Sequence, residues 1–373
     1  MKPLPIDVEY LVDLLERLID IPSPSGYTDS IVHFVGDELQ RLDIPYELTR
    51  RGAIRASLKG ETDSDERPSR GLVAHLDTLG AMVRKLKSNG RLEMVPIGTW
   101  SSRFAEGARI TIFTQEGPVR GTILPLKASG HIYDTEVDTQ PTGWPHVEVR
   151  VDAFCYTGDD LVKLGIRVGD YAALDPNFEI GENGFINSRY LDNKAGVATL
   201  LAAAKAIQAA EIKPEINCYL LFTLFEEVGS GASSILHGHI TEMVSVDNST
   251  AGPRQNSIED GITIAMMDSS GPFDYHLTNK LVTLCRDFDL THARDVFLHY
   301  RCDAASAVEA GNDIRTALVC YGVDASHGYE RTHKNSLEEL AKLLTLYIQS
   351  PATVGRDRYD LGPMKGFPTQ PIE

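Results

Sequence analysis

The spacing of hydrophobic residues divides the chain into regions of different texture. Apolar positions recur every three or four residues over 8–18 and again over 31–42, on either side of an IPSPSGY break, which predicts two amphipathic helices. From residue 83 to about 176 the pattern changes to short alternating runs separated by Gly and Pro, as in RLEMVPIGTW and HVEVRVDAF. Runs of this kind are typical of β-strands joined by turns.

After this β-rich stretch the chain returns to alternating helices and strands. The Ala-rich run KAGVATLLAAAKAIQAA predicts a helix, the apolar runs INCYLLFTLF and TEMVSV predict buried strands, and an apolar face over 337–348 predicts a final helix. We therefore predict an α/β fold. Residues 1–82 together with 177–373 form a mixed-sheet α/β/α domain, and residues 83–176 form an inserted β-barrel-like domain.

Composition and charge exclude several classes of function. The 373 residues include 53 acidic and 36 basic ones, for a net charge of −17, which repels nucleic acid and anionic membrane surfaces. No basic stretch precedes an apolar one at the start, and no run reaches the ~18 apolar residues of a membrane span, so we expect a cytoplasmic protein without nucleic-acid or membrane partners. Five cysteines without a CxxC pair indicate free thiols rather than a zinc–thiolate site.

Polar motifs that lie far apart in the sequence carry the candidate chemistry. They are AHLDTLG, YLDNKAG, LFEEVGSG and VSVDNS, and three of them follow a strand-like apolar run. In an open α/β sheet, side chains at the carboxyl ends of the strands gather in one crevice. Carboxylates and imidazoles that meet there match the ligands of two divalent cations bridged by a carboxylate. The candidates are His75, Asp77, Asp192, Glu226, Glu227 and Asp247.

Each motif taken alone has an ordinary structural explanation. A core histidine beside a turn aspartate accounts for His75 and Asp77 equally well, and Asp192 taken singly is an ordinary turn or cap residue. Glu226 and Glu227 could be a solvated strand end, but burying two adjacent carboxylates after FTLF is costly without a cation. Neighbouring positions also point in different directions, so one can bind a metal while the other acts as general base. The combination therefore favours a metal-dependent hydrolase.

The chain resembles the tetrahedral aminopeptidases, the glutamyl aminopeptidase family numbered forty-two among the metallopeptidases, through nearly its whole length. The resemblance rests on IPSPSGY, AHLDTLGAMV, KLGIRVGDYAALDP, LDNKAG, FEEVGSGA, VSVDNS, RCDAAS and YERTHKNSLEEL. It implies a two-metal exopeptidase domain whose inserted barrel makes dimer contacts, with dimers assembling into a hollow dodecamer. The chain also resembles a branch of the family found beside genes for an osmoprotectant glutamine dipeptide.

The resemblance implies two divalent metal ions per subunit, zinc in the first place, with cobalt or manganese as alternatives. One ion would be held by His75, Asp192 and Asp247. The second would be held by Asp192, Glu227 and His333, which makes Asp192 the bridge.

The resemblance also assigns the catalytic roles. Glu226 would be the general base that activates a metal-bridging water, and Asp77 would support the first imidazole. The family places its last imidazole shortly before the final helix, which favours His333 over His327. We therefore expect His327 to be a loop residue without a ligand role.

Several positions depart from the family pattern. Thr78 replaces an acidic residue, Lys194 replaces an arginine, and LHYRCDA replaces a Gly-rich stretch. Arg301 in that stretch could bind a substrate carboxylate or pair with a structural acid. Asp303 could contact substrate or be a buried structural aspartate.

The predicted function is a metal-dependent aminopeptidase that removes N-terminal residues from short peptides. The alternatives are a deacylase or amidase that acts on a small dipeptide-like metabolite with the same metals, and a non-catalytic assembly protein that retains the fold. Family members have also been labelled endoglucanases, but a glycosidase needs two opposed carboxylates and no metal.

Overall fold

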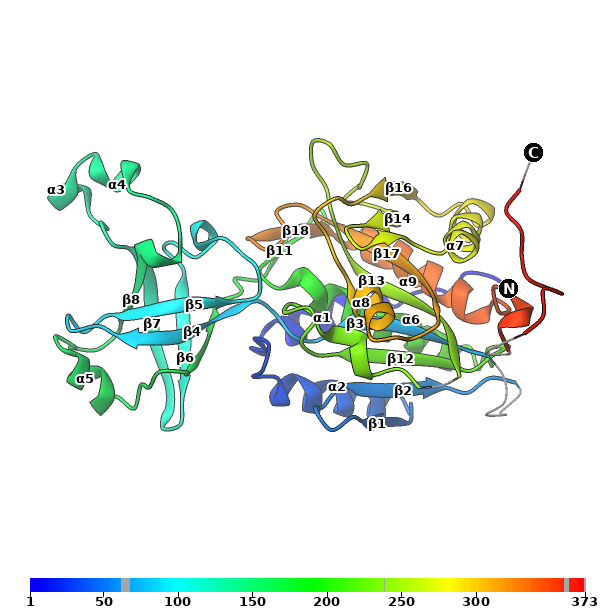
Figure 1. Ribbon diagram of the computed structural model, residues 1–373, viewed down its shortest axis with the longest axis horizontal. Helices are drawn as coiled ribbons and strands as arrows, with labels where there is room; N and C mark the ends of the chain where they lie inside the picture. Colours follow the sequence, from blue (N-terminus) through cyan, green and yellow to red (C-terminus); the bar gives the residue numbers. More distant parts are fainter. Residues whose placement is uncertain (62–67, 238, 359–361, 372–373) are drawn as a thin grey trace.

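The computed structural model describes residues 1–61, 68–237, 239–358 and 362–371. Figure 1 shows two bodies, a larger layered one and a smaller β-barrel that projects from it. The amino terminus and the last described residues of the chain lie at the end of the larger body that faces away from the barrel (Figure 1). Among the helices of the described ranges, none combines the length and the apolar character needed to cross a bilayer.

A mixed β-sheet forms the centre of the larger body. Its neighbouring strands run in the order β1-β2-β12-β3-β13-β17-β14-β15, and β16 pairs with β14. The four central strands are parallel, whereas β2 and β14 run antiparallel to their central neighbours. The strands are β1 (Tyr46–Leu48), β2 (Ile54–Leu58), β3 (Ser69–His75), β12 (Cys218–Thr223), β13 (Ile240–Thr250), β14 (Ile262–Asp268), β15 (Gly271–Pro272), β16 (His292–Val296) and β17 (Arg315–Val323).

Helices cover both faces of this sheet. On one face Leu72 and Ala74 of β3 pack into the core formed with the long helices, and on the other face Val73 packs with Ala304 and Ala307. Because both faces are buried, the middle positions of the central strands are largely apolar on both faces instead of alternating. The mixed-sheet α/β/α prediction is confirmed. The helices are α1 (Val8–Ile19), α2 (Asp29–Arg41), α6 (Leu191–Ala209), α7 (Tyr275–Asp287) and α9 (Lys334–Gln349) on the first face, and α8 (Asp303–Glu309) with the 3-10 turn η3 (Gly231–Ser234) on the second.

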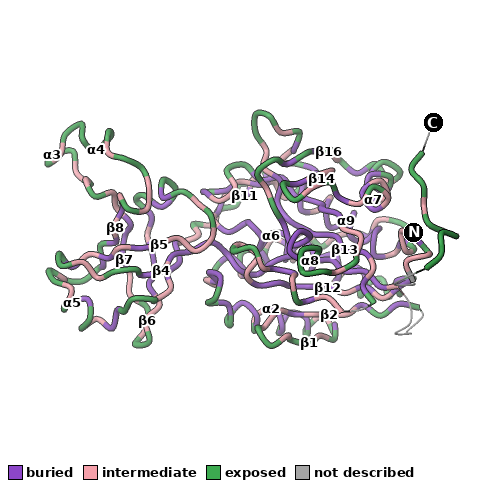
Figure 2. Tube along the Cα trace, in the orientation of Figure 1, coloured by how far each residue is buried: buried purple, intermediate pink, exposed green. Residues whose placement is uncertain are grey.

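The inserted body is a closed barrel with strand order β4-β5-β8-β7-β6-β9. It runs from Gly80 to Leu174, where the alternating pattern predicts an insertion over 83–176. In β8 the sequence VEVRV alternates buried valines with outward-facing polar residues, as a barrel wall requires. Figure 2 shows mostly buried and intermediate positions along the barrel strands, and largely exposed helices α3 and α4 at the far end. The elements are β4 (Gly80–Leu86), β5 (Leu92–Ile97), β6 (Arg109–Thr114), β7 (Gly117–Pro125), β8 (Val147–Val151) and β9 (Tyr171–Leu174), with α3 (Gly130–Tyr133), α4 (Glu136–Thr139) and α5 (Gly158–Lys163) outside.

A small antiparallel sheet lies near the junction of the two bodies (Figure 1). It consists of β10 (Glu179–Ile180), β11 (Phe185–Ser188) and β18 (Glu330–His333), with β11 in the middle. Strand β18 leads directly into α9, the final helix predicted from the apolar face. This sheet therefore connects the end of the insertion with the segment between β17 and α9.

Candidate functional site

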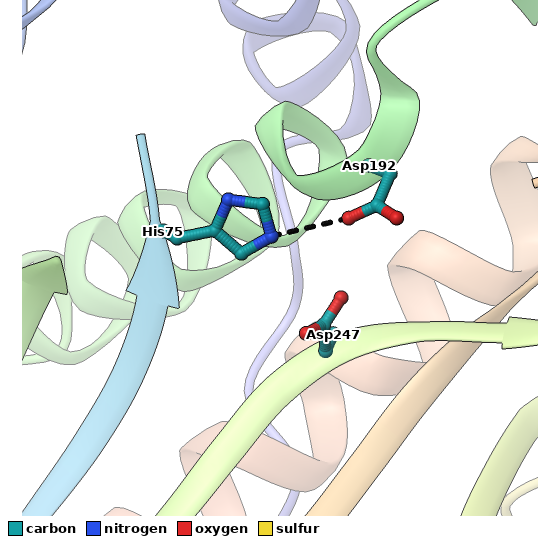
Figure 3. Close-up of side chains that lie close together, drawn as sticks. All are labelled: His75, Asp192 and Asp247. Carbon is teal, nitrogen blue, oxygen red and sulfur yellow. Dashed lines mark hydrogen bonds and ion pairs between the residues drawn. The ribbon is translucent and has the colours of Figure 1, made fainter. Parts of the chain in front are cut away.

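His75 is the last residue of β3 and is almost fully buried. Its Nδ1 N–H donates to the main-chain carbonyl oxygen of Asp77 at 2.8 Å, since a carbonyl can only accept. In the neutral ring Nε2 then carries a lone pair, and this atom lies 3.1 Å from Oδ1 of Asp192 (Figure 3). A lone pair and a carboxylate repel each other unless a proton or a cation lies between them. The geometry therefore suits a cation.

Asp192 and Asp247 complete a first group around this imidazole. Asp192 lies in the first turn of α6, and Asp247 lies on β13, one strand away from β3. Figure 3 shows the three side chains pointing toward a common space. One potential ligand atom from each of His75, Asp192 and Asp247 lies within 4.8 Å of the other two. These three side chains, two from strands and one from the start of a helix, therefore converge in the structure.

A second group shares Asp192 with the first and adds Glu227 and His327, again with ligand atoms within 4.8 Å of one another. Nε2 of His327 lies 3.4 Å from Asp192 Oδ2 and 3.7 Å from Glu227 Oε2. The Nδ1 N–H of His327 donates to the carbonyl oxygen of Thr99, which lies just beyond β5 of the inserted body. Within the described residues, the buried Oε1 of Glu227 has no hydrogen-bond partner.

The structure places His333, which the resemblance favoured as the last ligand, outside both groups. His333 caps the start of α9, where its Nδ1 accepts the N–H of Asn335 at 3.1 Å. Its Nε2 donates to the carbonyl oxygen of Asn183 at 2.9 Å, so both ring nitrogens are engaged outside the two groups. His327 instead follows the apolar run of β17 by four residues. That strand-end position is the signal that could have identified it.

Glu226 lies beside the first group. Its Oε2 is 3.7 Å from Nε2 of His75, and its backbone N–H donates to Oδ1 of Asp77 at 3.1 Å. The other oxygen of Asp77 accepts the hydroxyl of Ser25 at 2.5 Å. Asp77 therefore holds the imidazole with its main-chain carbonyl and the Glu226 segment with its carboxylate, whose Oδ1 lies 3.7 Å from Nδ1 of His75.

Burial and neighbouring carboxylates raise the pKa of most acids in the site, whereas the imidazoles lower that of Asp192. Burial raises the pKa of Glu226 and of Glu227 well above the ordinary range, and burial with the neighbouring Asp192 raises the pKa of Asp247 to about 7. Burial also acts to raise the pKa of Asp192, but the His327 and His75 imidazoles hold it below its usual value.

The two imidazoles experience the reverse effects. Burial lowers the pKa of each ring, but the surrounding carboxylates raise that of His75 well above its usual value and that of His327 to about 10. The carboxylates of the site therefore carry more negative charge than its two imidazoles balance, even when both are protonated.

A cleft of about 780 Å³ opens onto both groups and is lined by Asp192, Glu226, Glu227, Asp247 and His327, among others. Arg301 lies on this cleft but pairs with Glu309 through two bonds, one of 2.7 Å. Asp303 starts α8 and accepts the hydroxyl of Thr223 at 2.7 Å. A groove of about 890 Å³ beside α8, β15 and the carboxyl-terminal segment contains none of the candidate ligands.

Known proteins resemble this chain in sequence. The family model of the M42 glutamyl aminopeptidases matches residues 52–343. The chain is 36% identical to YhfE of Bacillus subtilis (strain 168) over 345 residues, which cover 92% of this chain and 99% of that protein. It is 26% identical to lysyl aminopeptidase of Pyrococcus furiosus over 223 residues, which cover 58% of this chain and 60% of that protein.

Solved structures with the same fold include two archaeal peptidases. An aminopeptidase from Desulfurococcus kamchatkensis superposes with a TM-score of 0.81 at 21% identity, over 92% of this chain and 95% of that one. The TET1 peptidase of Pyrococcus horikoshii, which can assemble into a tetrahedron or a large octahedral shell, gives 0.79 at 20% identity, over 91% and 99% of the two chains. At this identity the likeness establishes the fold.

Proposed function

This chain belongs to the M42 glutamyl aminopeptidase family and is a peptide hydrolase, and from that premise we propose that it removes N-terminal residues from short peptides at a two-metal centre. The observation that carries the proposal is the convergence of two ligand groups that share one carboxylate. The first group is His75, Asp192 and Asp247, and the second is Asp192, Glu227 and His327. Asp192 is the proposed bridge.

The residues of the site fit divalent cations on three counts. The donors are imidazole nitrogens and carboxylate oxygens, which suit zinc, cobalt or manganese. Oε1 of Glu227 is buried without a partner among the described residues, and a bound cation would satisfy it. The lone pair of His75 Nε2 faces the Asp192 carboxylate at 3.1 Å, a contact that a cation between them makes favourable.

Divalent cations at such a centre polarise the scissile carbonyl and lower the pKa of water. Glu226 is the proposed general base, which takes a proton from the attacking water and delivers it to the leaving amine. Its carboxylate lies 3.7 Å from His75, outside both ligand groups, and burial raises its pKa, as proton transfer near neutral pH requires. The bond from its backbone N–H to Asp77 fixes the segment that carries it.

The cleft also favours a substrate with a free amine. Three of the four carboxylates that line it are proposed ligands whose charge the cations balance, but the chain as a whole carries a net charge of −17, which attracts a cationic peptide N-terminus. A blocked amine lacks that charge. The same centre could serve a deacylase or amidase, so the preference for a free amine is the feature to test.

Metal depletion and restoration on paired substrates test the proposal. The protein is stripped with a chelator and assayed on free and N-acetylated aminoacyl and dipeptide amides, before and after addition of zinc, cobalt or manganese. We expect activity to return with metal, and only on free amines. Restored cleavage of the acetylated substrates would favour the deacylase or amidase. Equal activity before and after metal addition would overturn the two-metal proposal.

We also propose that the chain forms a homo-oligomer, of dimers in a dodecamer, through the inserted barrel. The barrel exposes two large apolar side chains just before α5, Phe154 at 91% and Tyr156 at 73%. Light scattering of purified protein should give a mass well above that of the 41.0 kDa chain. Phe154→Asp should lower this mass. Met364→Asp is the matched control, because Met364 is a large apolar side chain outside the barrel and is 81% exposed. A monomer in the wild type would contradict the assembly proposal.

A further inference from the structure

Glu330 connects the two chain segments that carry Asp192 and His327, and we infer that it is a positioning residue for the metal centre. It is the first residue of β18 and is 2% exposed. Its Oε2 accepts the backbone N–H of Asp192 at 3.1 Å, and its Oε1 accepts the backbone N–H of His327 at 3.0 Å. One carboxylate thus holds the proposed bridge and the proposed imidazole ligand of the second group in a fixed relation. The inference rests on the proposed two-metal function.

Both partners of Glu330 are donors, so both of its terminal atoms must accept. Only a carboxylate does this, because a glutamine amide offers one acceptor and one NH2 group. In a Glu330→Gln variant the NH2 group would face a backbone N–H, and one buried donor would lose its partner. The contact therefore requires a carboxylate, and a side chain of the same size and shape is not enough.

The two backbone positions held by Glu330 need outside support. His327 has a φ of +64°, in the left-handed region that non-glycine residues rarely adopt. The N–H of Asp192 lies in the first turn of α6, where no carbonyl of the preceding turn can accept it. Without Glu330 both segments would lose a restraint next to a ligand, and the ligand atoms would be free to spread apart.

Glu330 lies outside the substrate cleft. It is absent from the residues that line the substrate cleft. It lines instead a small apolar pocket that also includes Leu79, Trp100, Asp192 and His327. A substrate in the cleft therefore contacts the ligands and not Glu330, so its effect must pass through the geometry of the metal centre.

The test is a metal titration of the stripped protein, which does not depend on turnover. Zinc is titrated into wild type and Glu330→Gln against a chromophoric chelator. We expect one of the two zinc sites to weaken by about 10- to 100-fold in the variant, the range seen when outer hydrogen-bond partners of ligands are removed. Equal affinities at both sites in a folded variant would overturn the inference. If wild type binds only one zinc ion, the two-metal proposal itself fails, and the inference with it.

Asp295→Asn is the matched control. Asp295 lies on the edge strand β16, is 3% exposed, and its Oδ2 accepts the backbone N–H groups of Asn256 at 2.9 Å and Ser257 at 3.0 Å. The substitution makes the same chemical change in a buried acid that belongs to neither ligand group. We expect wild-type zinc affinity in this variant. A loss equal to that of Glu330→Gln would assign the effect to general destabilisation and overturn the inference.

Two further measurements complete the test. The absorption spectrum of cobalt-loaded protein reports the ligand geometry, and we expect it to change in Glu330→Gln and not in Asp295→Asn. If Glu330→Gln does not fold, Glu330→Asp takes its place, because it keeps both acceptor oxygens and withdraws them by one methylene group. We expect the same zinc site to weaken by a smaller factor. Wild-type affinities and an unchanged cobalt spectrum in Glu330→Asp would overturn the inference.

Discussion

Strands β3 and β13 lie side by side and bury charged residues at both ends, but the charges are balanced differently at the two ends. At the amino end, Arg70 and Glu242 are partners in the strand register, and their side chains form an ion pair of 2.9 Å. The hydroxyl of Tyr347 and the backbone N–H of Thr353 each donate to Glu242 at 2.9 Å. Both oxygens of this acid are therefore satisfied by the protein itself.

The carboxyl end of the same strands has no such balance. His75 and Asp247 meet Asp192, Glu226 and Glu227 there, together with the imidazole of His327. Among the described residues, the ion pairs of Asp192, Glu226 and Glu227 are with the imidazoles of His75 and His327 and not with arginine or lysine.

The pKa values express this contrast. Burial acts to raise the pKa of both acids, but Arg70 holds that of Glu242 below its ordinary value, while that of Glu226 rises well above it. A buried acid is thus structural where the fold supplies its counter-charge. Where the fold does not, the acid is a candidate for binding or catalysis.

The largest expected effect comes from a change at the carboxyl end of β3 and β13, where the buried charges are not balanced. Glu226→Gln removes the proposed proton acceptor and leaves both ligand groups intact, so turnover should fall by about 10²- to 10⁴-fold. Steady-state kinetics on a free dipeptide amide measure the loss, and metal analysis of the same sample should give wild-type content. Wild-type turnover would remove Glu226 from the mechanism.

The next largest effect comes from a change at the amino end of these strands, where Arg70 and Glu242 balance each other. Arg70→Met leaves Glu242 buried without its counter-charge, which should lower the free energy of unfolding by about 3–5 kcal/mol. Urea denaturation of the stripped protein measures this change. The double variant Arg70→Met/Glu242→Leu should recover most of the loss, because it removes both charges together. Zinc affinity should stay at the wild-type value in both variants, and a large change would show that the two ends are not independent.

Two histidine variants test which imidazole belongs to the metal site. His327→Ala removes a proposed ligand, so one zinc site should weaken by more than the about 10- to 100-fold expected for an outer partner. His333→Ala removes the cap of α9, which should cost about 1 kcal/mol of stability and leave zinc binding unchanged. Zinc competition and urea denaturation separate the two results. The reverse pattern would restore His333 as the ligand.

The smallest expected effect is a pH dependence of the stability that the Arg70–Glu242 pair contributes. The folded-state pKa of Glu242 lies below its ordinary value of 4.5, so its contribution to stability is fully present above that pH. The contribution is lost as the pH falls through the lowered pKa, by about 1.4 kcal/mol for each pKa unit of depression. Urea denaturation between neutral and acidic pH should show a shallower decline in Arg70→Met/Glu242→Leu than in wild type. Parallel curves would mean that Arg70 does not stabilise the ionised form of Glu242.

Much of the fold followed from local patterns in the sequence. Helical spacing indicated α1, α2 and α9, and the change to short alternating runs indicated the inserted barrel. These features are predictable because side-chain periodicity depends only on the local backbone geometry. The strand-end rule also grouped His75 and Asp247, since parallel strands end at one edge of a sheet, and the resemblance added Asp192.

Other features depended on contacts that the sequence does not reveal. His327 and His333 are six residues apart, and the choice between them is decided by a left-handed turn and by the helix cap that engages His333. Glu330 was not a candidate at all, because one of its partners is a backbone N–H 138 residues away. Every residue except proline carries such an N–H, so no motif marks the pair. The sequence by itself therefore determined the elements, the family and most of the acids, whereas only the tertiary structure decided which imidazole joins them and what holds it there.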